Sequence, residues 1–280
     1  MTVCIAAVCE GGKQLVVGAD QMVTISAPLN VEFDPPLSKI ESMGTSSVAL
    51  GAGNTLYVAE ILRQARDEYQ NVQSPVPQIA DAVCKVYKRY RDEKAEELVI
   101  LPPLGLDFLN FRLRGGTLPA YLQPQPGIYQ QLTVMASRWN LGVDIIVAGI
   151  DQNGSHMYWV GNPGTSVCFD KIGYNAVGTG ATHVAIKLAL ELQHPNSSLA
   201  ETMLSVYGAK KASEVAPGVG QETEIKVVSQ EGIWLVRNEL MEIIRSSNAD
   251  EQSKSKPNIQ AIKEKYDELR KTSGSDSGGN

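Results

Sequence analysis

The sequence of 280 residues is poor in histidine and cysteine, residue types that often hold metal ions. Its three histidines, His156, His183 and His194, show no metal-ligand spacing, and its four cysteines form no Cys-x-x-Cys pair. Cys4 and Cys9 lie in an apolar run, where cysteine usually behaves as a small hydrophobic residue. We therefore expect free thiols, a cytoplasmic location, and neither a metal ion nor another cofactor.

Basic residues are also outnumbered, with 25 lysines and arginines against 31 aspartates and glutamates, a net charge of -6. Nucleic acids and anionic membranes are negatively charged too, so nonspecific binding to either is disfavoured. Aromatic residues make up only 6% of the chain, and Trp139, Trp159 and Trp234 are too scattered to form a platform for stacking bases. Neither nucleic acid nor a membrane is an expected partner.

Long hydrophobic runs are missing, which argues against a membrane span. The apolar N-terminal stretch has no basic start and soon reaches a turn at residues 11–12, so we interpret it as a strand rather than a signal peptide. A Gly-Thr-Gly sequence at 178–180 lacks the further glycines and the lysine of a phosphate-binding loop. It predicts a tight bend.

What the chain does contain is a regular succession of hairpin and helix signals. Apolar and β-branched runs on either side of glycine or polar turns predict β-hairpins. These hairpins pair residues 3–9 with 14–19, 38–43 with 47–52, 143–150 with 157–160, and 224–228 with 233–236. Helical spacing predicts helices over 54–69 and 79–97, one after residue 180, and one capped by Ser197. The expected fold is α+β, with two antiparallel sheets and flanking helix pairs in a four-layer αββα sandwich.

Two stretches interrupt this order. Residues 94–132 contain many prolines and glycines and predict a long excursion or lid. Residues 246–280 are rich in serine, lysine, glutamate and asparagine, which predicts a flexible tail with one polar helical stretch near 259–269. We therefore expect a single domain over residues 1–245, followed by the tail.

Hairpin counting brings several candidate functional residues together. Across the first turn, residues whose numbers sum to about 22 face one another on the two strands. Thr2 is therefore expected opposite Asp20. In the second hairpin the same counting sets Lys39 opposite Gly51. Gly53 lies close by, where a strand ends and a helix begins with free N–H groups. A hydroxyl, a carboxylate, an ammonium and N–H donors are thus expected in one place.

This group has the chemistry of nucleophilic catalysis. A threonine hydroxyl needs a base, and a chain-terminal threonine carries one in its own α-amino group, which titrates near pH ~8. Met1 would have to be removed first, as generally happens to methionine before a small residue. Lys39 would then lower the pKa of the hydroxyl or relay its proton, and Asp20 would hold the lysine ammonium. The Gly53 N–H would stabilise the oxyanion.

Each of these residues alone has a simpler explanation. Small residues such as Thr2 often follow the initiator methionine, Lys39 could be a solvated strand residue, and Asp20 could belong to a turn. Their convergence by hairpin geometry is what favours catalysis.

Several stretches resemble the proteasome β-subunit and its bacterial relatives in the N-terminal-nucleophile (Ntn) hydrolase superfamily. In the first half they are TVC at 2–4, GADQMVT at 18–24, SKI at 38–40 and GAG at 51–53. In the second half they are DIIVAGID at 144–151, GSHMY at 154–158 and AVGTG at 176–180. Their order and approximate separation also agree, and the resemblance covers roughly residues 2–236.

The resemblance implies a role for each matching residue. The catalytic set is Thr2 as nucleophile, Asp20 and Lys39 as its charge partners, and Gly53 as oxyanion donor. Thr24 would align a peptide as a β-strand through its backbone, beside a side-chain pocket near Val23 and Gly51.

Two positions depart from the family's pattern. Thr179 stands where active members usually carry serine, and it keeps a hydroxyl near the amine of the nucleophile. The family's Asp-x-x-Ser sequence has only Glu214 as a counterpart within residues 213–218.

The function expected from these residues is that of a threonine-type Ntn hydrolase. It would cleave peptides or unfolded proteins through an acyl ester on Thr2, and the resemblance implies a homo-oligomer, which could be a ring. Two alternatives stay open at this point. One is a catalytically inactive proteasome-like scaffold, and the other is an Ntn amidase that acts on a small-molecule amide.

Overall fold

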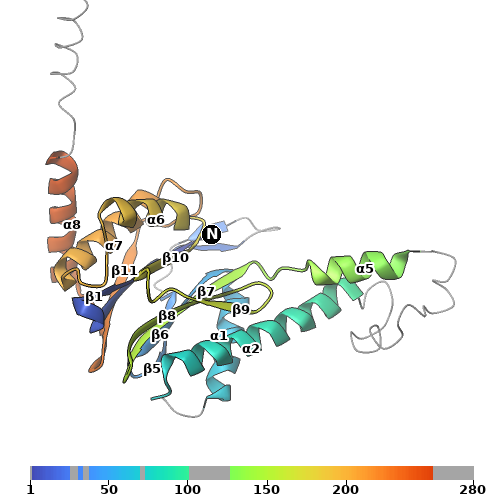
Figure 1. The fold of residues 1–280 in the computed structure, drawn as a ribbon. Coiled ribbons are helices and arrows are strands. Elements are labelled where there is room, and N and C mark those ends of the chain that lie inside the picture. Colours follow the sequence, from blue (N-terminus) through green and yellow to red (C-terminus); the bar gives the residue numbers. More distant parts are fainter. Residues whose placement is uncertain (1, 26–30, 34–37, 70–72, 101–126, 255–280) are drawn as a thin grey trace, which may run out of the picture. The chain divides into compact units, whose positions relative to one another are not determined.

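The computed structural model describes residues 2–25, 31–33, 38–69, 73–100 and 127–254 (Figure 1). The chain divides into two compact units, residues 1–237 and 238–280. It is an α+β protein with two five-stranded antiparallel sheets, and its described residues form six α-helices. The predicted α+β class is therefore confirmed.

The first sheet contains the N-terminal hairpin. Its strands, in spatial order, are β10 (Tyr174–Gly178), β1 (Val3–Cys9), β2 (Gln14–Asp20), β11 (Thr223–Ser229) and β12 (Gly232–Leu235). Every residue of β1 is buried, which is why this strand is a continuous run of Val, Cys, Ile and Ala without alternating polar residues. Helices α6 (Ala181–Leu190) and α7 (Leu199–Ser213) contact the strands of this sheet.

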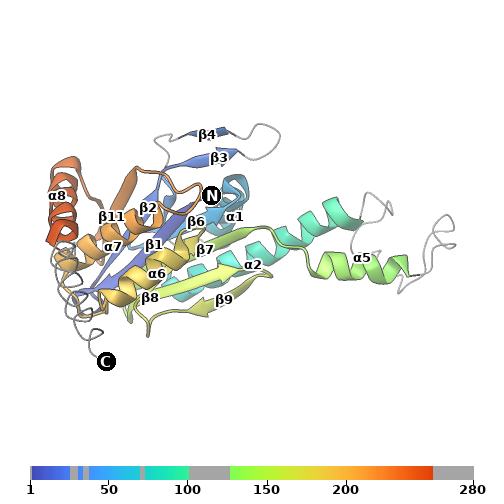
Figure 2. The same ribbon diagram turned by 90° about the horizontal axis from the view of Figure 1, so that it is seen from above.

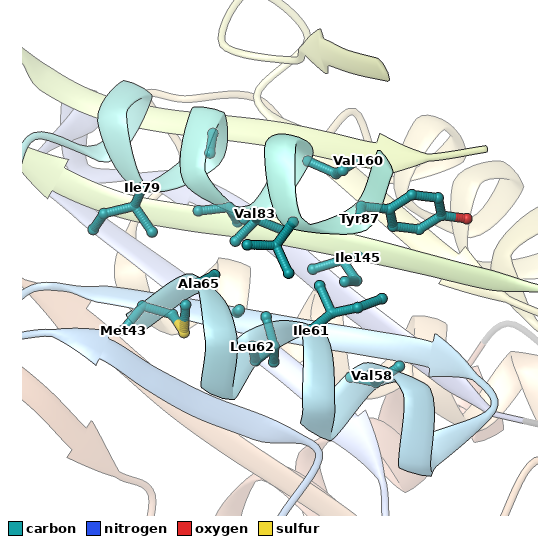
Figure 3. Packing of buried hydrophobic residues seen from close by; sticks show 14 of the residues in the cluster. Met43, Val58, Ile61, Leu62, Ala65, Ile79, Val83, Tyr87, Ile145 and Val160 are labelled. Atoms are coloured by element: carbon teal, nitrogen blue, oxygen red, sulfur yellow. The ribbon is translucent and has the colours of Figure 1, made fainter. Parts of the chain in front are cut away.

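The second sheet carries the predicted hairpins of residues 38–52 and 143–160, whereas the predicted closing hairpin, β11 and β12, belongs to the first sheet. Its strands, in spatial order, are β5 (Ile40–Gly44), β6 (Ser47–Gly53), β7 (Val143–Asp151), β8 (Gly154–Gly161) and β9 (Thr165–Cys168). Helices α1 (Thr55–Glu68) and α2 (Val76–Ala95) contact β6, β7 and β8. Figure 3 shows Ile61, Leu62, Val83 and Tyr87 of these helices gathered around Ile145 of β7.

A second buried cluster joins the two sheets. It contains Val17 and Val177 from the first sheet together with Leu50, Ile146 and Ala148 from the second. Strands β1 and β2 contact β6 and β7 directly. Buried residues of the two sheets are therefore in contact.

The remaining elements are short or lie outside these sheets. They are β3 (Val23–Ile25) and β4 (Val31–Phe33), which form a separate two-stranded sheet (Figure 2), the 3-10 helix η1 (Glu10–Gly12), the π-helical turn η2 (Glu96–Ile100), α5 (Ile128–Ser137) and α8 (Asn238–Lys254). Within the described ranges, no helix is long and apolar enough to cross a membrane.

Most predicted elements are present, with two corrections to helix starts. Helix α1 begins after Asn54 as predicted, and the Asn54 side chain accepts hydrogen bonds from the first-turn N–H groups. Helix α2 starts at Val76 instead of residue 79, because proline is well tolerated in a first turn. The cap of α7 is Ser198, not Ser197, and Ser198 forms a reciprocal capping box with Glu201.

The two irregular stretches contain more helix than composition predicted. The predicted excursion at 94–132 begins at the end of α2, continues with η2 and ends inside α5, while residues 101–126 lie outside the described ranges. Helix α8 runs through Lys254, so the predicted tail is helical over its first residues. Met241 and Ile244 recur at helical spacing there, a signal that the polar composition obscured. The stretch at 259–269 lies outside the described residues.

Candidate active site

The hydroxyl of Thr2 lies between an acid and a base. Its Oγ1 donates a short hydrogen bond to Asp20 Oδ1 and accepts one from Lys39 Nζ. Thr2 is only 4% exposed, so both contacts are formed away from bulk water. The three residues that hairpin counting selected therefore meet in one buried cluster.

The register that brings Thr2 to Asp20 differs from the predicted one. Cys4 pairs with Ala19 and Cys9 with Gln14, so facing positions sum to 23 and not to 22. The four-residue connection at 10–13 accounts for the shift, because Cys9 and Gln14 are the last paired residues on either side of it. Thr2 lies one residue before β1, and its side chain reaches Asp20 from that position.

Asp20 ends β2 and is completely buried, yet its carboxylate is fully surrounded by donors. Oδ1 accepts from the Val3 N–H at 2.8 Å, and Oδ2 accepts from the N–H groups of Met22 at 3.2 Å and Gly220 at 3.0 Å. Lys39 Nζ lies 3.0 Å from both oxygens. A buried carboxylate requires such compensation, and this one has it from backbone and ammonium together.

Lys39 lies immediately before β5, and its side chain is 8% exposed. Ile40 pairs with Leu50, a register that continues to the predicted pairing of Lys39 with Gly51. The residues on both sides of Lys39 contact Lys226 of β11, whose Nζ donates to the Ser38 hydroxyl at 3.0 Å and to the Ile40 carbonyl at 2.9 Å. A strand of the first sheet therefore holds the residues that flank Lys39.

Gly53 ends β6 with a φ of +106°, a conformation that favours glycine. A Cβ at this position would lie 1.9 Å from the Gly142 carbonyl oxygen. The preceding residue, Ala52, and the Thr2 carbonyl both lie against Gly178, so the end of β6 is next to the N-terminal residue. Among the described residues, Gly53 takes no part in the hydrogen bonds of the Thr2 cluster. Its role as an oxyanion donor stays a prediction.

Gly51 serves the packing of helix α1. A Cβ on Gly51 would lie 2.1 Å from Val58 Cγ1, so only glycine lets this helix approach the strand so closely. Its carbonyl accepts a hydrogen bond from the Cys4 thiol at 3.5 Å. Burial raises the pKa of Cys4 to about 12, so this thiol stays neutral and is not a competing nucleophile. A role of Gly51 in a substrate pocket stays a prediction.

Thr179 contacts the backbone of the candidate nucleophile. Its Oγ1 lies 3.3 Å from the Thr2 carbonyl oxygen and 3.3 Å from the Pro217 carbonyl oxygen. A hydroxyl has one hydrogen, so it donates to one of the two carbonyls at a time. The preceding Gly178 has a φ of +98°, and a Cβ there would lie 2.2 Å from the Thr2 carbonyl oxygen. Glycine is what allows β10 to approach Thr2 so closely.

Two predicted substrate contacts stay predictions, and one predicted support residue contacts other side chains. Val23 and Thr24 belong to β3, where Thr24 pairs with Glu32 through the backbone, and their side chains lie outside what the structure describes. Glu214 does not reach Thr2, and its Oε1 instead accepts hydrogen bonds from Lys210 at 2.5 Å and Lys211 at 2.7 Å.

Sequence reasoning missed three residues around the cluster, namely Gly220, Lys226 and Lys210. Gly220 supplies an N–H to Asp20 from a point 200 positions away in the sequence. Lys226 and Lys210 left a detectable signal, because each is a charged residue at a position that faces inward in an apolar strand or helix. A lysine on an apolar stripe is rarely buried unless it is paired.

Comparison with known proteins adds nothing to this geometry, since no protein-family model and no curated protein matches the chain. Among the described residues, no group of three or more His, Cys, Asp or Glu side chains could hold a metal ion. His156 lies between two carboxylates instead, with Nδ1 2.7 Å from Asp170 and Nε2 3.4 Å from Asp151. The chemistry that the cluster can supply is therefore that of its hydroxyl, ammonium and carboxylate.

Proposed function

We propose that this chain is a proteasome-like threonine hydrolase of the Ntn type, which cleaves peptide bonds through an acyl ester on Thr2. The observation that carries the proposal is the buried contact of the Thr2 hydroxyl with Lys39 and Asp20. A hydroxyl on a merely structural residue needs one partner, and a buried lysine and aspartate need only each other. Here the lysine ammonium and the aspartate carboxylate both contact the Thr2 hydroxyl as well as each other, an arrangement that favours activation of a nucleophile.

The free α-amino group of Thr2 is the base in this proposal. In the unprocessed chain the Thr2 nitrogen is an amide, and an amide cannot accept a proton. Once Met1 is removed, the amine takes the hydroxyl proton while Oγ1 forms a bond to the substrate carbonyl carbon, and the π electrons of the carbonyl move to its oxygen. The Lys39 ammonium stabilises the negative charge that develops on Oγ1.

The intermediate then collapses to an ester. The bond between carbon and the leaving nitrogen breaks, and that nitrogen takes the proton from the Thr2 ammonium, which leaves an acyl group on Oγ1. Water attacks the ester with the Thr2 amine again as proton acceptor, and Oγ1 recovers its proton as the carboxylic acid departs. Asp20 keeps its contacts with Lys39 throughout, because its oxygens are already occupied by backbone donors.

Strand β3 supports a peptide as substrate. In the described part of the chain, only β4 pairs with β3, which leaves the other edge of this strand available for an extended peptide. Thr24 lies in the middle of β3, four residues after Asp20. A peptide bound to this edge would run close to Thr2.

The contacts between elements also support the finer architecture. Helices α6 and α7 contact one sheet, α1 and α2 contact the other, and the sheets share a buried cluster. We propose that these layers form the αββα sandwich expected of an Ntn hydrolase.

Turnover of fluorogenic peptides by the methionine-processed protein tests the proposal. Thr2→Ala should reduce kcat/KM by on the order of 1,000-fold or more, because it removes the nucleophile, while Thr2→Ser should retain measurable turnover. Turnover of small amides but not of peptides would favour the amidase. Equal residual rates for wild type and Thr2→Ala would favour an inactive scaffold and would contradict the proposal.

A further inference from the structure

We propose that Lys210 is a positioning residue for the active site, acting through the backbone of Gly220 on the Asp20 carboxylate. This inference rests on the proposed function. Lys210 lies in α7 and is completely buried. It does not touch Thr2 or Lys39, so any effect on catalysis must pass through the loop that joins α7 to β11, residues 214–222.

Three hydrogen bonds fix the Lys210 ammonium. Nζ donates to the Gly220 carbonyl and to the Gln221 carbonyl, each at 2.7 Å, and to Glu214 Oε1 at 2.5 Å. An ammonium has three donors, so every one of them is used. Two of the three bonds go to the backbone of the loop rather than to a side chain, which holds two consecutive peptide units of the loop in place.

The same short segment of loop holds the active site. The Gly220 N–H donates to Asp20 Oδ2 at 3.0 Å, while its carbonyl accepts from Lys210. Earlier in the loop, the Pro217 carbonyl oxygen lies 3.3 Å from the Thr179 hydroxyl, which also contacts Thr2. The loop therefore meets the site at two points, and Lys210 anchors it next to the one at Asp20.

Burial of a lysine ammonium costs desolvation free energy, which its hydrogen bonds and nearby negative charges must offset. Desolvation lowers the pKa of Lys210, and the negative charges of Glu214 and Asp20 act in the opposite direction. The ammonium thus also contributes positive charge near the Asp20 carboxylate. A leucine or methionine would fill the same space in α7 without that cost. What neither could do is hold the Gly220 peptide against Asp20.

Lys211 provides a matched control. It is the next residue in the helix and donates to the same Glu214 oxygen at 2.7 Å, but its side chain is 32% exposed. The variants to compare are Lys210→Met, Lys211→Met and Lys210→Gln. Lys210→Gln keeps an N–H donor but loses the charge. If Lys210→Met does not fold, Lys210→Gln tests whether Lys210 positions the active site.

The experiment measures acylation of Thr2 by a peptide β-lactone in the full-length, methionine-processed protein. The rate constant kinact and the half-saturating concentration KI are determined separately, and hydrogen exchange is followed over residues 215–222. In Lys210→Met we expect kinact to fall about 10- to 100-fold, as misplacement of catalytic groups produces, with KI changed less than about 3-fold. Exchange in the loop should be faster, Lys210→Gln should be intermediate, and Lys211→Met should match wild type.

The failures of the two proposals are distinguishable. If wild type is not acylated, the proposed function is wrong and this inference falls with it. If wild type is acylated and folded Lys210 variants keep its kinact, Lys210 has a structural role only. Equal effects of Lys210→Met and Lys211→Met, or an effect on KI alone, would also overturn the positioning role.

Discussion

The Thr2 hydroxyl is held in one orientation by unlike neighbours. Because Lys39 donates to one lone pair of Oγ1, the hydroxyl hydrogen points to Asp20, and the oxygen keeps its proton. Removal of Met1 introduces an amine that competes with Asp20 for this hydrogen. In our proposal, the reactivity of Thr2 therefore depends on the removal of Met1 and not on a change of fold.

Substitution of Lys39 tests the electrostatic part of this description. Lys39→Met keeps most of the apolar stem but removes the positive charge beside Oγ1, so acylation of Thr2 by a β-lactone should slow by about 100- to 10,000-fold. Lys13→Met, an exposed lysine in the first hairpin turn, is the matched control and should react like wild type. An unchanged rate in Lys39→Met would show that the ammonium is not needed.

Gly53 offers a test of backbone geometry at the residue scale. Gly53→Ala would place a Cβ 1.9 Å from the Gly142 carbonyl oxygen, whereas Gly154, with a similar φ of +117°, has nothing within 4 Å of its Cβ position. Both alanines suffer the same kind of backbone strain. Gly53→Ala should therefore cost about 1–3 kcal/mol more in unfolding free energy than Gly154→Ala, as overpacking does. Urea denaturation of both variants measures this, and equal losses would contradict the close approach of β6 to Gly142.

At the scale of elements, the sequence was most informative where the signal is local. Hairpins 3–20 and 143–161 follow from apolar runs and glycine turns, and the cap of α1 follows from Asn54 alone. β9 was missed because all four of its residues are exposed and show no alternation. The first register was off by one residue, because a connection over residues 10–13 pairs positions that sum to 23.

The cap of α7 gives a prediction at this scale. Ser198 Oγ accepts from the Glu201 N–H and donates to the Glu201 carboxylate, whereas Ser197 Oγ contacts only the exposed His194. Ser198→Ala should lower the unfolding free energy by about 1 kcal/mol. Ser197→Ala should change it by less than about 0.5 kcal/mol. Chemical denaturation of the pair decides between the two serines, and the reverse order would favour the cap predicted from sequence.

At the scale of the whole molecule, the candidate site joins segments that are far apart in sequence. Thr2, Asp20 and Lys39 could be predicted because two hairpins and a known pattern relate them. The partners of Gly220 and Lys226 could not be predicted, since Asp20 and Ser38 are 200 and 188 positions away from them. The pairing of β2 with β11 brings Gly220 close to Asp20, and no local signal specifies that pairing.

Two buried thiols make the stability of the molecule sensitive to alkaline pH. Burial raises the pKa of Cys4 to about 12 and that of Cys9 to about 11, from an ordinary value of 9.0. A raised thiol pKa means that the fold favours the neutral form, so this stability is present below pH 9 and is lost as pH rises toward 11 and 12. The unfolding free energy should fall by roughly 2–3 kcal/mol between pH ~8 and ~10 from these groups.

The contribution of the thiols is isolated by a double variant. Cys4→Ala combined with Cys9→Ala should show a smaller loss of stability over the same pH range, since tyrosines and lysines titrate equally in both proteins. Urea unfolding at several pH values under reducing conditions measures the difference. Parallel pH profiles would show that the two thiols ionise as easily in the folded protein as in the unfolded chain.

The central claim is that Thr2 is a nucleophile which acts together with its own freed amine, and a peptide epoxyketone tests it most directly. Such a probe has two electrophilic positions, so the Thr2 oxygen can add to the ketone while the Thr2 nitrogen opens the epoxide. Intact-protein and peptide mass spectrometry should find Met1 absent, one probe per chain, and the adduct on the N-terminal peptide. Thr2→Ala should remain unlabelled. A chain that retains Met1 and is not modified, or that is modified elsewhere in both proteins, would contradict the claim.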